Sequence, residues 1–452
     1  MKSTLMNRTI FAVTTAGNFA SMMDFSSVNI ALYKMAESFA MPVSAVQWVM
    51  LAGQIVMTSL LIFCGRLSDI VNRRKLYTAG FVVFAVGGYA SYFAPGFVWL
   101  LVARVFQSVG GAILIANSFG IVSSVFEGKA RGKALGFLGA VVHLAGMTAP
   151  VLGGWLIEAF DWRAVFLPGA VVATIAAVPS ARFIPVSERR KGVSVDIVGT
   201  VLLFLSVSSL LLMVANGVSF FVCLSFAVSA VLFPIREKKA AQPLIDLALF
   251  KNKPFLFANL ALAVSYWAMY TNTILFPFYA QGALHLNAKT TGEMIFPFSL
   301  AYLIVAIFTG SFQPHKKMLA GMIILSFGLF GFSQTGLETS CIFLITMQVI
   351  MGMGNGLFQP SVNTAIMNAV GKENTGTAGG VLSLSRNTGI ATGSVLAVAL
   401  FEAVKNSARG SGISLEKSFV SAYHTGLYAG IFFAAICLLF IVLSMPRKGK
   451  TG

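Results

Sequence analysis

Two ionisable side chains, Asp24 and Arg104, fall inside apolar stretches that are otherwise almost free of charge. A charge buried in hydrocarbon costs at least about 2.5 kcal/mol, so such a residue usually faces a cavity or a partner and has a task. Burial favours a neutral carboxylic acid, whereas a nearby guanidinium favours the carboxylate. A carboxyl group under both influences can take up and release a proton, which is the chemistry we expect here. The alternative is a static ion pair that holds two helices together.

The two residues lie at similar depths in the stretches that contain them. Asp24 is roughly nine residues from the end of the stretch 9–33, or about 13 Å at the helical rise. Arg104 is roughly seven residues from one end of the stretch 97–122, or about 10 Å. Both distances are measured from the predicted outer side of the membrane. We therefore expect the two side chains to interact.

The elements that position these residues are membrane-spanning helices. The chain has 452 residues, 57% hydrophobic and only 10% charged, whereas soluble domains carry about 25% charged residues. Helices are expected because lipid offers no partner for backbone amides, and the short alternating segments of a lipid-facing barrel are not visible. Stretches long enough to cross a roughly 30 Å hydrocarbon layer occur fourteen times. The predicted spans are 9–33, 44–64, 76–94, 97–122, 133–157, 164–184, 196–215, 218–235, 254–281, 291–311, 318–337, 341–369, 377–404 and 421–445.

The charge distribution predicts the orientation of these spans. The net charge is +17, and most of the 32 Lys and Arg residues fall in alternate loops and at the two termini. Positive loops face the cytoplasm, so we expect a multi-pass protein of the cytoplasmic (inner) membrane with both termini inside. The first stretch is too long for a cleavable signal peptide and contains Asp24. No basic cluster on a soluble fold indicates a nucleic-acid partner.

Enzymatic and metal chemistry find no support in the sequence. No zinc motif, phosphate-binding glycine loop or nucleophile elbow is present, and no loop is long enough to be a nucleotide domain. We expect no cofactor and no enzymatic activity. The energy source is then an ion gradient, a partner subunit or the gradient of the substrate itself. The cysteines are scattered singly and are expected to pack as small apolar residues: Cys64, Cys223, Cys341 and Cys437.

Four sequence motifs resemble those of a known family. Residues 65–75 (Gly-Arg-Leu-Ser-Asp-Ile-Val-Asn-Arg-Arg-Lys) resemble the loop between helices 2 and 3 of the major facilitator superfamily. Residues 101–108 resemble its Arg-x-x-Gln-Gly motif, with Ser108 in place of the glycine. Residues 24–32 (Asp-Phe-Ser-Ser-Val-Asn-Ile-Ala-Leu) resemble a stretch typical of the fourteen-helix drug:proton antiporters, a family that residues 196–199 and 242–247 also fit. The antiporter motif of helix 5 is matched by Gly136, Ala145, Ala149, Pro150, Gly153 and Gly154, with alanine in two glycine positions.

The resemblance implies a fold and a function. The fold would be two six-helix bundles, at 1–190 and 253–452, with an inserted helix pair and linker at 191–252. The function would be proton-coupled efflux of many lipophilic, often cationic compounds by alternating access, carried out by a monomer. The alternative is a proton-coupled exporter or uptake carrier for one metabolite, siderophore or lipid. A membrane sensor fits poorly, because no soluble signalling domain is present.

The resemblance also suggests a gate. Asp69 would accept hydrogen bonds at the start of a short helix and pair with Arg73 as a cytoplasmic latch. We expect Gly65 to allow a tight helix exit where a side chain would clash, and Asn72 to tolerate a left-handed backbone. The alternative is a solvated basic loop that only sets orientation. In helix 5 the pivot would be formed by Pro150, Gly153 and Gly154; its alternative is ordinary small-residue packing.

The substrate site is expected near the middle of the membrane. Aromatic residues of the ninth span would form an adaptable wall whose faces can hold a cation, and amides of spans 2 and 12 would add polar contacts. Lipid-facing aromatics and helix-packing amides are the alternative for each residue. The predicted substrate residues are Tyr266, Trp267, Tyr270, Asn272, Phe276, Gln54, Asn355 and Gln359.

Three other charged residues lie in or near the spans. Arg386 is expected to extend or pair toward the cytoplasmic side. A part for Glu293 or Glu402 in proton coupling is left open.

Overall fold

The computed structural model describes residues 2–126, 128–186, 196–216, 219–240, 247–309, 313–370 and 375–445. Within these ranges a few side chains, such as that of Asp69, are not described. Helices and short connections make up these ranges, and no strand occurs in them. The helices are α1 (Lys2–Phe39), α2 (Val43–Val46), α3 (Trp48–Ile70), α4 (Arg73–Tyr92), α5 (Phe97–Val125), α6 (Gly128–Ala159), η1 (Trp162–Phe166), α7 (Leu167–Phe183), α8 (Ile197–Asn216), α9 (Phe220–Lys239), η2 (Leu247–Lys251), α10 (Lys253–Gly282), α11 (Ala288–Thr309), α12 (Pro314–Phe332), α13 (Cys341–Asn368), α14 (Thr375–Gly410) and α15 (Leu415–Leu443).

Each of the fourteen predicted spans overlaps a long helix, although 44–64 also covers the short α2 and 164–184 begins in η1. The predicted all-α membrane fold is therefore confirmed. Within the described part of the chain, eight helices are long and apolar enough to cross a membrane by length and composition alone. Helix α1 is not in that set. Its side chains Asn18, Ser21 and Asp24 are buried, which indicates that α1 has internal partners.

Several helices begin at a residue whose side chain caps them. Asn72 accepts a hydrogen bond from the backbone N–H of Lys75 and so begins α4. Asn252, Ser340 and Ser414 do the same for α10, α13 and α15. A capping oxygen satisfies one of the four N–H groups that lack a partner in the first turn. The backbone of Asn72 has a negative φ of −59°, so the predicted left-handed conformation is wrong: the residue is a helix cap.

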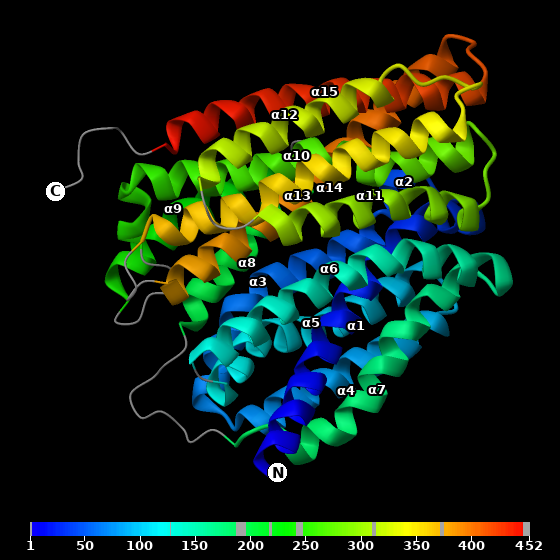
Figure 1. Ribbon diagram of the computed structural model, residues 1–452. Coiled ribbons are helices and arrows are strands. Elements are labelled where there is room, and N and C mark those ends of the chain that lie inside the picture. Colours follow the sequence, from blue (N-terminus) through cyan, green and yellow to red (C-terminus); the bar gives the residue numbers. More distant parts are fainter. Residues whose placement is uncertain are drawn as a thin grey trace. The chain divides into compact units, whose positions relative to one another are not determined.

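The chain divides into two compact units. Unit 1 comprises Met1–Ser209 with Cys223–Leu244, and unit 2 comprises Leu210–Val222 with Ile245–Gly452. The expected domain limits at residues 190 and 252 stay a prediction. Figure 1 shows the order of the helices along the chain.

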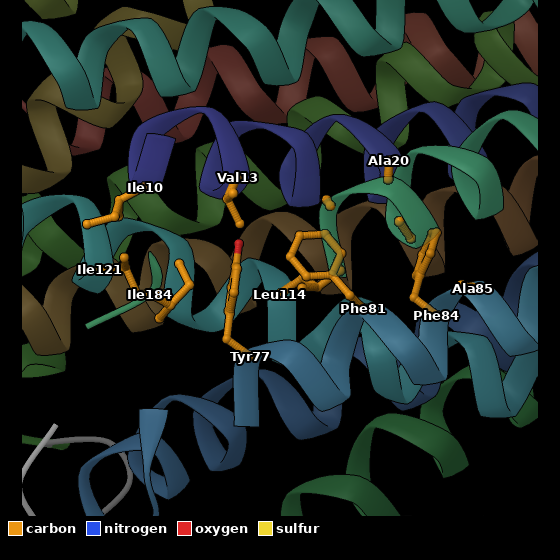
Figure 2. Close-up of a cluster of buried hydrophobic side chains, with 12 residues drawn as sticks. Ile10, Val13, Ala20, Tyr77, Phe81, Phe84, Ala85, Leu114, Ile121 and Ile184 are labelled. Carbon is orange, nitrogen blue, oxygen red and sulfur yellow. The ribbon is translucent and has the colours of Figure 1, made fainter. Parts of the chain in front are cut away.

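In unit 1, helix α1 packs against α5, α6 and α7, while α4 lies against both α5 and α7. Figure 2 shows the apolar cluster where α1, α4, α5 and α7 meet. Tyr77 is fully buried there, and its hydroxyl group forms a 2.9 Å hydrogen bond with that of Ser118. The cluster consists of Ile10, Val13, Ala20, Tyr77, Phe81, Phe84, Ala85, Leu114, Ile121, Ala173, Ala176 and Ile184.

Helices α8 and α9 are joined near both ends. At one end the guanidinium of Arg236 donates to both carboxylate oxygens of Asp196 at 3.0–3.2 Å. Asp196 also accepts a 2.9 Å hydrogen bond from the N–H of Gly199 in the first turn of α8. Farther along, Ser209 donates to Ser225 at 2.8 Å. The Asp196–Gly199 segment therefore both caps α8 and fastens it to α9.

In unit 2, helix α10 packs against α13, α14 and α15, while α13 also packs against α11 and α12. Glycines allow the closest approach, because a Cβ at Gly354 would lie 2.6 Å from the carbonyl oxygen of Gly321. Tyr279 of α10 and Tyr423 of α15 stack with ring centroids 4.6 Å apart. The helix that carries most of the predicted substrate residues, α10, is thus the central packing element of its unit.

Candidate functional site

The candidate site of unit 1 is a buried ion pair between α1 and α5. The Arg104 Nη1 donates to Asp24 Oδ2 at 2.6 Å, and the two side chains are only 4% and 5% exposed. The predicted interaction between these residues is present in the structure. Its part in proton coupling stays a prediction, because a static pair would have the same geometry.

Gln107 completes the site; the sequence motif at 101–108 contains it, but no role at the site was predicted for it. Its Nε2 donates to the other oxygen of Asp24 at 2.9 Å, and its Oε1 accepts from Arg104 Nη1 at 2.6 Å. Arg104 also donates from Nε to the carbonyl oxygen of Val49 at 3.2 Å and lies over the ring of Phe166. Arg104 and Gln107 are three residues apart, so they lie on one face of α5. That spacing is the signal by which the sequence would have identified Gln107.

Glycines bring the surrounding helices close to the site. A Cβ at Gly87 of α4 would lie 2.6 Å from Gln107 Cα and 2.7 Å from its backbone nitrogen. A Cβ at Gly53 of α3 would lie 2.6 Å from the hydroxyl oxygen of Ser108. Real Cβ atoms do not approach other atoms so closely, so α4 reaches α5 at Gly87 only because that position lacks a side chain, whereas at Gly53 the Ser108 hydroxyl group would have to shift.

A cavity of about 20 Å³ adjoins the ion pair. Asp24, Gln54 and Arg104 are among the residues that line it. This volume is about that required by one water molecule and excludes an organic molecule. Gln54, a predicted substrate residue, therefore lies beside the candidate proton site in unit 1.

The arrangement links the protonation of Asp24 to its contacts. As a carboxylate, Asp24 holds Arg104 and Gln107 through two short hydrogen bonds. A charged pair taken out of water is stable only while both partners are present. Protonation would neutralise Asp24 and weaken its attraction for Arg104, so α1 and α5 would lose their strongest polar contact. Such a group can couple proton binding to movement of helices.

The predicted gate residues lie at the junction of α3 and α4. Gly65 is inside α3, which continues to Ile70, and a Cβ at Gly65 would meet nothing within 4 Å. The expected clash and tight helix exit at Gly65 are therefore wrong for this conformation. Arg73 is the first residue of α4, and the side chain of Asp69 lies outside the described residues. The latch between Asp69 and Arg73 stays a prediction.

The predicted pivot of helix α6 packs against α1. Pro150 lies inside α6, and the Ser27 hydroxyl donates to the carbonyl oxygen of Ala149 at 3.3 Å. A Cβ at Gly153 would lie 3.2 Å from the side chain of Ile30, and Gly154 is buried beside it. These contacts show close packing along the predicted motif, and a role as a pivot remains to be tested.

In unit 2, the structure brings together some of the predicted substrate residues. The Tyr266 hydroxyl donates to Gln359 Oε1 at 3.4 Å, and the rings of Tyr266 and Tyr270 lie 6.0 Å apart. Asn355 precedes Gln359 by one helical turn on α13 and is also buried. Tyr266, Tyr270 and Gln359 thus form one polar and aromatic group within the unit.

Other predicted substrate residues have partners elsewhere in unit 2. Trp267 donates from its indole N–H to the Thr392 hydroxyl at 2.7 Å. Asn272 accepts from the Tyr423 hydroxyl at 2.6 Å and donates to Gln348 at 3.4 Å. Phe276 is fully buried and packs edge-on against another phenylalanine ring. These three side chains have structural contacts in this conformation, and their part in substrate binding stays a prediction.

Two acidic residues of unit 2 were left open as coupling groups. Glu293 on α11 is exposed. Glu402 on α14 is mostly buried and accepts a 2.9 Å hydrogen bond from Lys405 one turn later. Neither lies in a cluster like that of Asp24 within the described part of the chain. Their part in coupling remains open.

Long helices that enclose buried charged and amide groups define a class of protein, the multi-pass membrane transporter, which is not an enzyme. The chain belongs to the Major Facilitator Superfamily, whose family model matches residues 14–394. The four motifs noted in the sequence are consistent with this membership.

Curated relatives of the chain are transporters. It is 30% identical to the riboflavin transporter RibZ of Clostridioides difficile (strain 630), over 98% of the chain and 98% of that protein. It is 26% identical to the multidrug transporter protein MdtP of Bacillus subtilis (strain 168), over 87% of the chain and 74% of that protein. It is 29% identical to the multidrug resistance protein Stp of Mycobacterium tuberculosis (strain H37Rv), over 86% of the chain and 75% of that protein.

Solved structures share the fold. A bacterial homologue of the human lysosomal transporter Spinster, in an inward-facing and unoccupied conformation, matches with a TM-score of 0.70 at 14% identity over 97% of both chains. A POT family transporter in complex with 5-aminolevulinic acid matches with a TM-score of 0.69 at 13% identity, over 96% of this chain and 94% of that one. At such identities the likeness concerns the fold alone.

Proposed function

We propose that this chain exports lipophilic compounds in exchange for protons by alternating access. The observation that carries the proposal is the buried Asp24–Arg104 pair with Gln107. An embedded carboxylate that is held by a cation and an amide has two clear states, charged and paired or neutral and released. Proton binding from outside would favour the released state and so the return to an inward-open conformation.

The proposal also covers the cytoplasmic gate, the location in the membrane and the oligomeric state. The junction of α3 and α4, with Gly65, Asp69 and Arg73, would act as a cytoplasmic latch. The packed seam of α6 on α1 would serve as the pivot. The chain would act as a monomer in the cytoplasmic membrane, with both termini in the cytoplasm, as the distribution of Lys and Arg supports. The two multidrug relatives support efflux of more than one compound.

A second candidate is the transport of one planar solute such as riboflavin. Two observations favour it: the riboflavin transporter matches over 98% of its length, and the group formed by Tyr266, Tyr270 and Gln359 is aromatic and contains amide and hydroxyl groups. Such groups stack on a flat ring system and hydrogen-bond to its edges. A selective carrier would use the same proton site as a multidrug exporter.

One pair of assays separates the two candidates. Cells that express the chain are tested for efflux of a panel of dyes and antibiotics, with and without a protonophore. Riboflavin auxotrophs that express it are tested for growth on low riboflavin. Efflux of several unrelated compounds that stops with the protonophore supports the first proposal. Riboflavin-dependent growth without drug efflux supports the second. If neither drug efflux nor riboflavin-dependent growth is observed, both candidates are rejected.

A further inference from the structure

The side chains of Asp24, Arg104 and Gln107 form a closed ring of hydrogen bonds. Arg104 Nη1 donates to Asp24 Oδ2 and to Gln107 Oε1, both at 2.6 Å, and Gln107 Nε2 donates to Asp24 Oδ1 at 2.9 Å. The orientation of the Gln107 amide follows from its partners: a guanidinium has no acceptor, so the amide oxygen has to face Arg104. The amide nitrogen then faces Asp24, and the ring closes only around a carboxylate.

A proton on Asp24 does not fit into this ring. Three N–H groups meet three acceptor oxygens in it, so a fourth hydrogen finds no acceptor inside the ring. On Oδ2 that hydrogen would face an N–H of Arg104, and on Oδ1 it would face the N–H of Gln107. The two donors differ, because the guanidinium has donors only, whereas the amide also carries an acceptor. Within the ring, Gln107 alone can turn to accept the hydrogen of the acid.

A turn of the amide changes its contact with Arg104. With Oε1 toward Asp24, the amide N–H groups point at the guanidinium, so that donor faces donor. Asp24 is then neutral and no longer holds Arg104 by a charged hydrogen bond. The guanidinium keeps two other contacts, the carbonyl oxygen of Val49 at 3.2 Å and the ring of Phe166. These contacts give Arg104 a position once the ring has opened.

The packing around Gln107 favours movement of the amide over movement of the backbone. A Cβ at Gly87 would lie 2.6 Å from Gln107 Cα, so α4 holds this part of α5 closely. Beside the amide lies Gly88, where a Cβ would be 3.2 Å from Gln107 Nε2. Because glycine has no side chain, nothing from this position crowds the amide group. The backbone is therefore fixed while the end of the side chain is not.

We propose that Gln107 is a positioning residue whose amide turns when Asp24 is protonated and so releases Arg104. Protonation then opens the polar contact between α1 and α5, and loss of the proton from the same carboxyl group closes it again. This inference rests on the proposed proton-coupled transport and names the side chain that converts proton binding into movement.

The pH dependence of the ring can be assigned to Asp24. Among the described residues that line the adjoining cavity, from α1, α3, α4 and α5, only Asp24 and Arg104 are ionisable. Helix α7 approaches Asp24 with Gly169, and the α6 residues in the buried cluster around Met23 are alanines. The competing acceptor for the hydrogen of the acid is a water molecule in the cavity of about 20 Å³. With such a water molecule the Gln107 amide would keep its orientation.

Infrared difference spectroscopy of the purified full chain tests the turn directly. Subtracting spectra recorded at acidic and alkaline pH shows the side-chain carbonyl groups whose hydrogen bonds change. We expect a carboxylic acid band from Asp24 together with an amide carbonyl band from Gln107, and neither band in Asp24→Asn. Gln107→Met keeps the length of the side chain without the amide, so it should keep the acid band and lose the amide band. An acid band without an amide band in the unaltered chain would overturn the inference.

Transport in proteoliposomes measures the consequence of the turn. Gln107→Met should lower accumulation driven by a pH gradient roughly 10- to 100-fold, the effect of losing a hydrogen bond to a charged group, while exchange at equal pH should change little. Gln107→Asn keeps an amide but is one methylene shorter, so it should not reach both partners and should lose accumulation as well. This variant carries the test if Gln107→Met does not fold.

The matched control is Asn117→Leu, which removes another buried amide of α5. Asn117 donates to the backbone carbonyl oxygens of Cys64 and Ile113 at 3.3 and 2.8 Å and takes no part in the ring. Its loss should leave both the infrared bands and the ratio of accumulation to exchange unchanged. An equal loss of accumulation in Asn117→Leu and Gln107→Met would mean that Gln107 acts only through packing, and would overturn the inference.

The two assays together separate this inference from the proposed function. If the Gln107 amide band appears but no compound accumulates in response to a pH gradient, the transport proposal fails and the amide switch stands. If a pH gradient drives accumulation and Gln107→Met retains it in full, the transport proposal stands and the amide switch is rejected.

Discussion

Arg104 in unit 1 and Arg386 in unit 2 both lie inside long helices, and their surroundings differ. Arg104 in unit 1 is matched by the carboxylate of Asp24 at 2.6 Å, with Gln107 bridging the two. Arg386 in unit 2 is only half-buried and has no carboxylate partner in the described residues. The charge of Arg104 is satisfied within the protein, whereas that of Arg386 is partly exposed. Together with the aromatic group of Tyr266 and Tyr270, this difference suggests a division of labour, with the proton bound in unit 1 and the substrate in unit 2.

The largest effect should come from removing the titratable group of unit 1. Asp24→Asn keeps the shape and can still accept from Arg104, but it cannot exchange a proton. We expect substrate accumulation driven by a pH gradient to fall at least about tenfold, a loss of about 1.4 kcal/mol of driving force. Exchange of labelled for unlabelled substrate at equal pH should continue. Vesicle uptake measures both, and full accumulation by Asp24→Asn would reduce the pair to a structural role.

The next effect contrasts the stabilities of the two arginine sites. Arg104→Gln leaves the buried carboxylate of Asp24 without its cation, which typically costs about 3–5 kcal/mol. Arg386→Gln removes a half-buried charge that has no carboxylate partner in the described residues, so the unfolding temperature should change little. Thermal unfolding of the purified variants in one detergent provides the comparison. Equal destabilisation by the two substitutions would mean that Arg386 has a structural partner after all.

The smallest effect concerns two glycines on neighbouring helices of unit 1. Gly87→Ala places a Cβ about where Gln107 already lies, and overpacking of this kind costs about 1–3 kcal/mol. Gly65→Ala adds a Cβ in open space inside α3, so it should stabilise the helix by about 0.5–1 kcal/mol. Unfolding midpoints should therefore shift in opposite directions. A loss at Gly65 as large as that at Gly87 would indicate that the junction of α3 and α4 packs closely in another conformation.

The sequence predicted the spans and the ion pair because both follow from simple counts. Apolar stretches of membrane length show as helices whatever their neighbours are, and Asp24 and Arg104 lie at matching depths in their spans. The role of Gln107 could also have been predicted, since this residue follows Arg104 by three residues on the same helix face. The free space at Gly65 could not be predicted, because a single sequence does not show where a helix ends relative to its neighbours.

The setting of Arg386 lay further beyond the sequence. The adjacent Ser385 donates to Asn259 of α10, which is 126 residues earlier in the chain. Only the packing of α14 on α10 places them together. The same holds for Asn272, whose amide is bound by Tyr423 and Gln348 from two other helices. Hydropathy identifies that such polar residues are buried but does not identify their partners.

The central claim is that proton and substrate bind at separate sites, and proton release from the purified chain tests it most directly. A substrate identified by the efflux assay is added to unbuffered protein, and a pH-indicator dye records the protons released. The account predicts release by the unaltered chain, none by Asp24→Asn, and release by Tyr270→Phe once the substrate concentration is raised to restore occupancy. Undiminished release by Asp24→Asn would contradict the account.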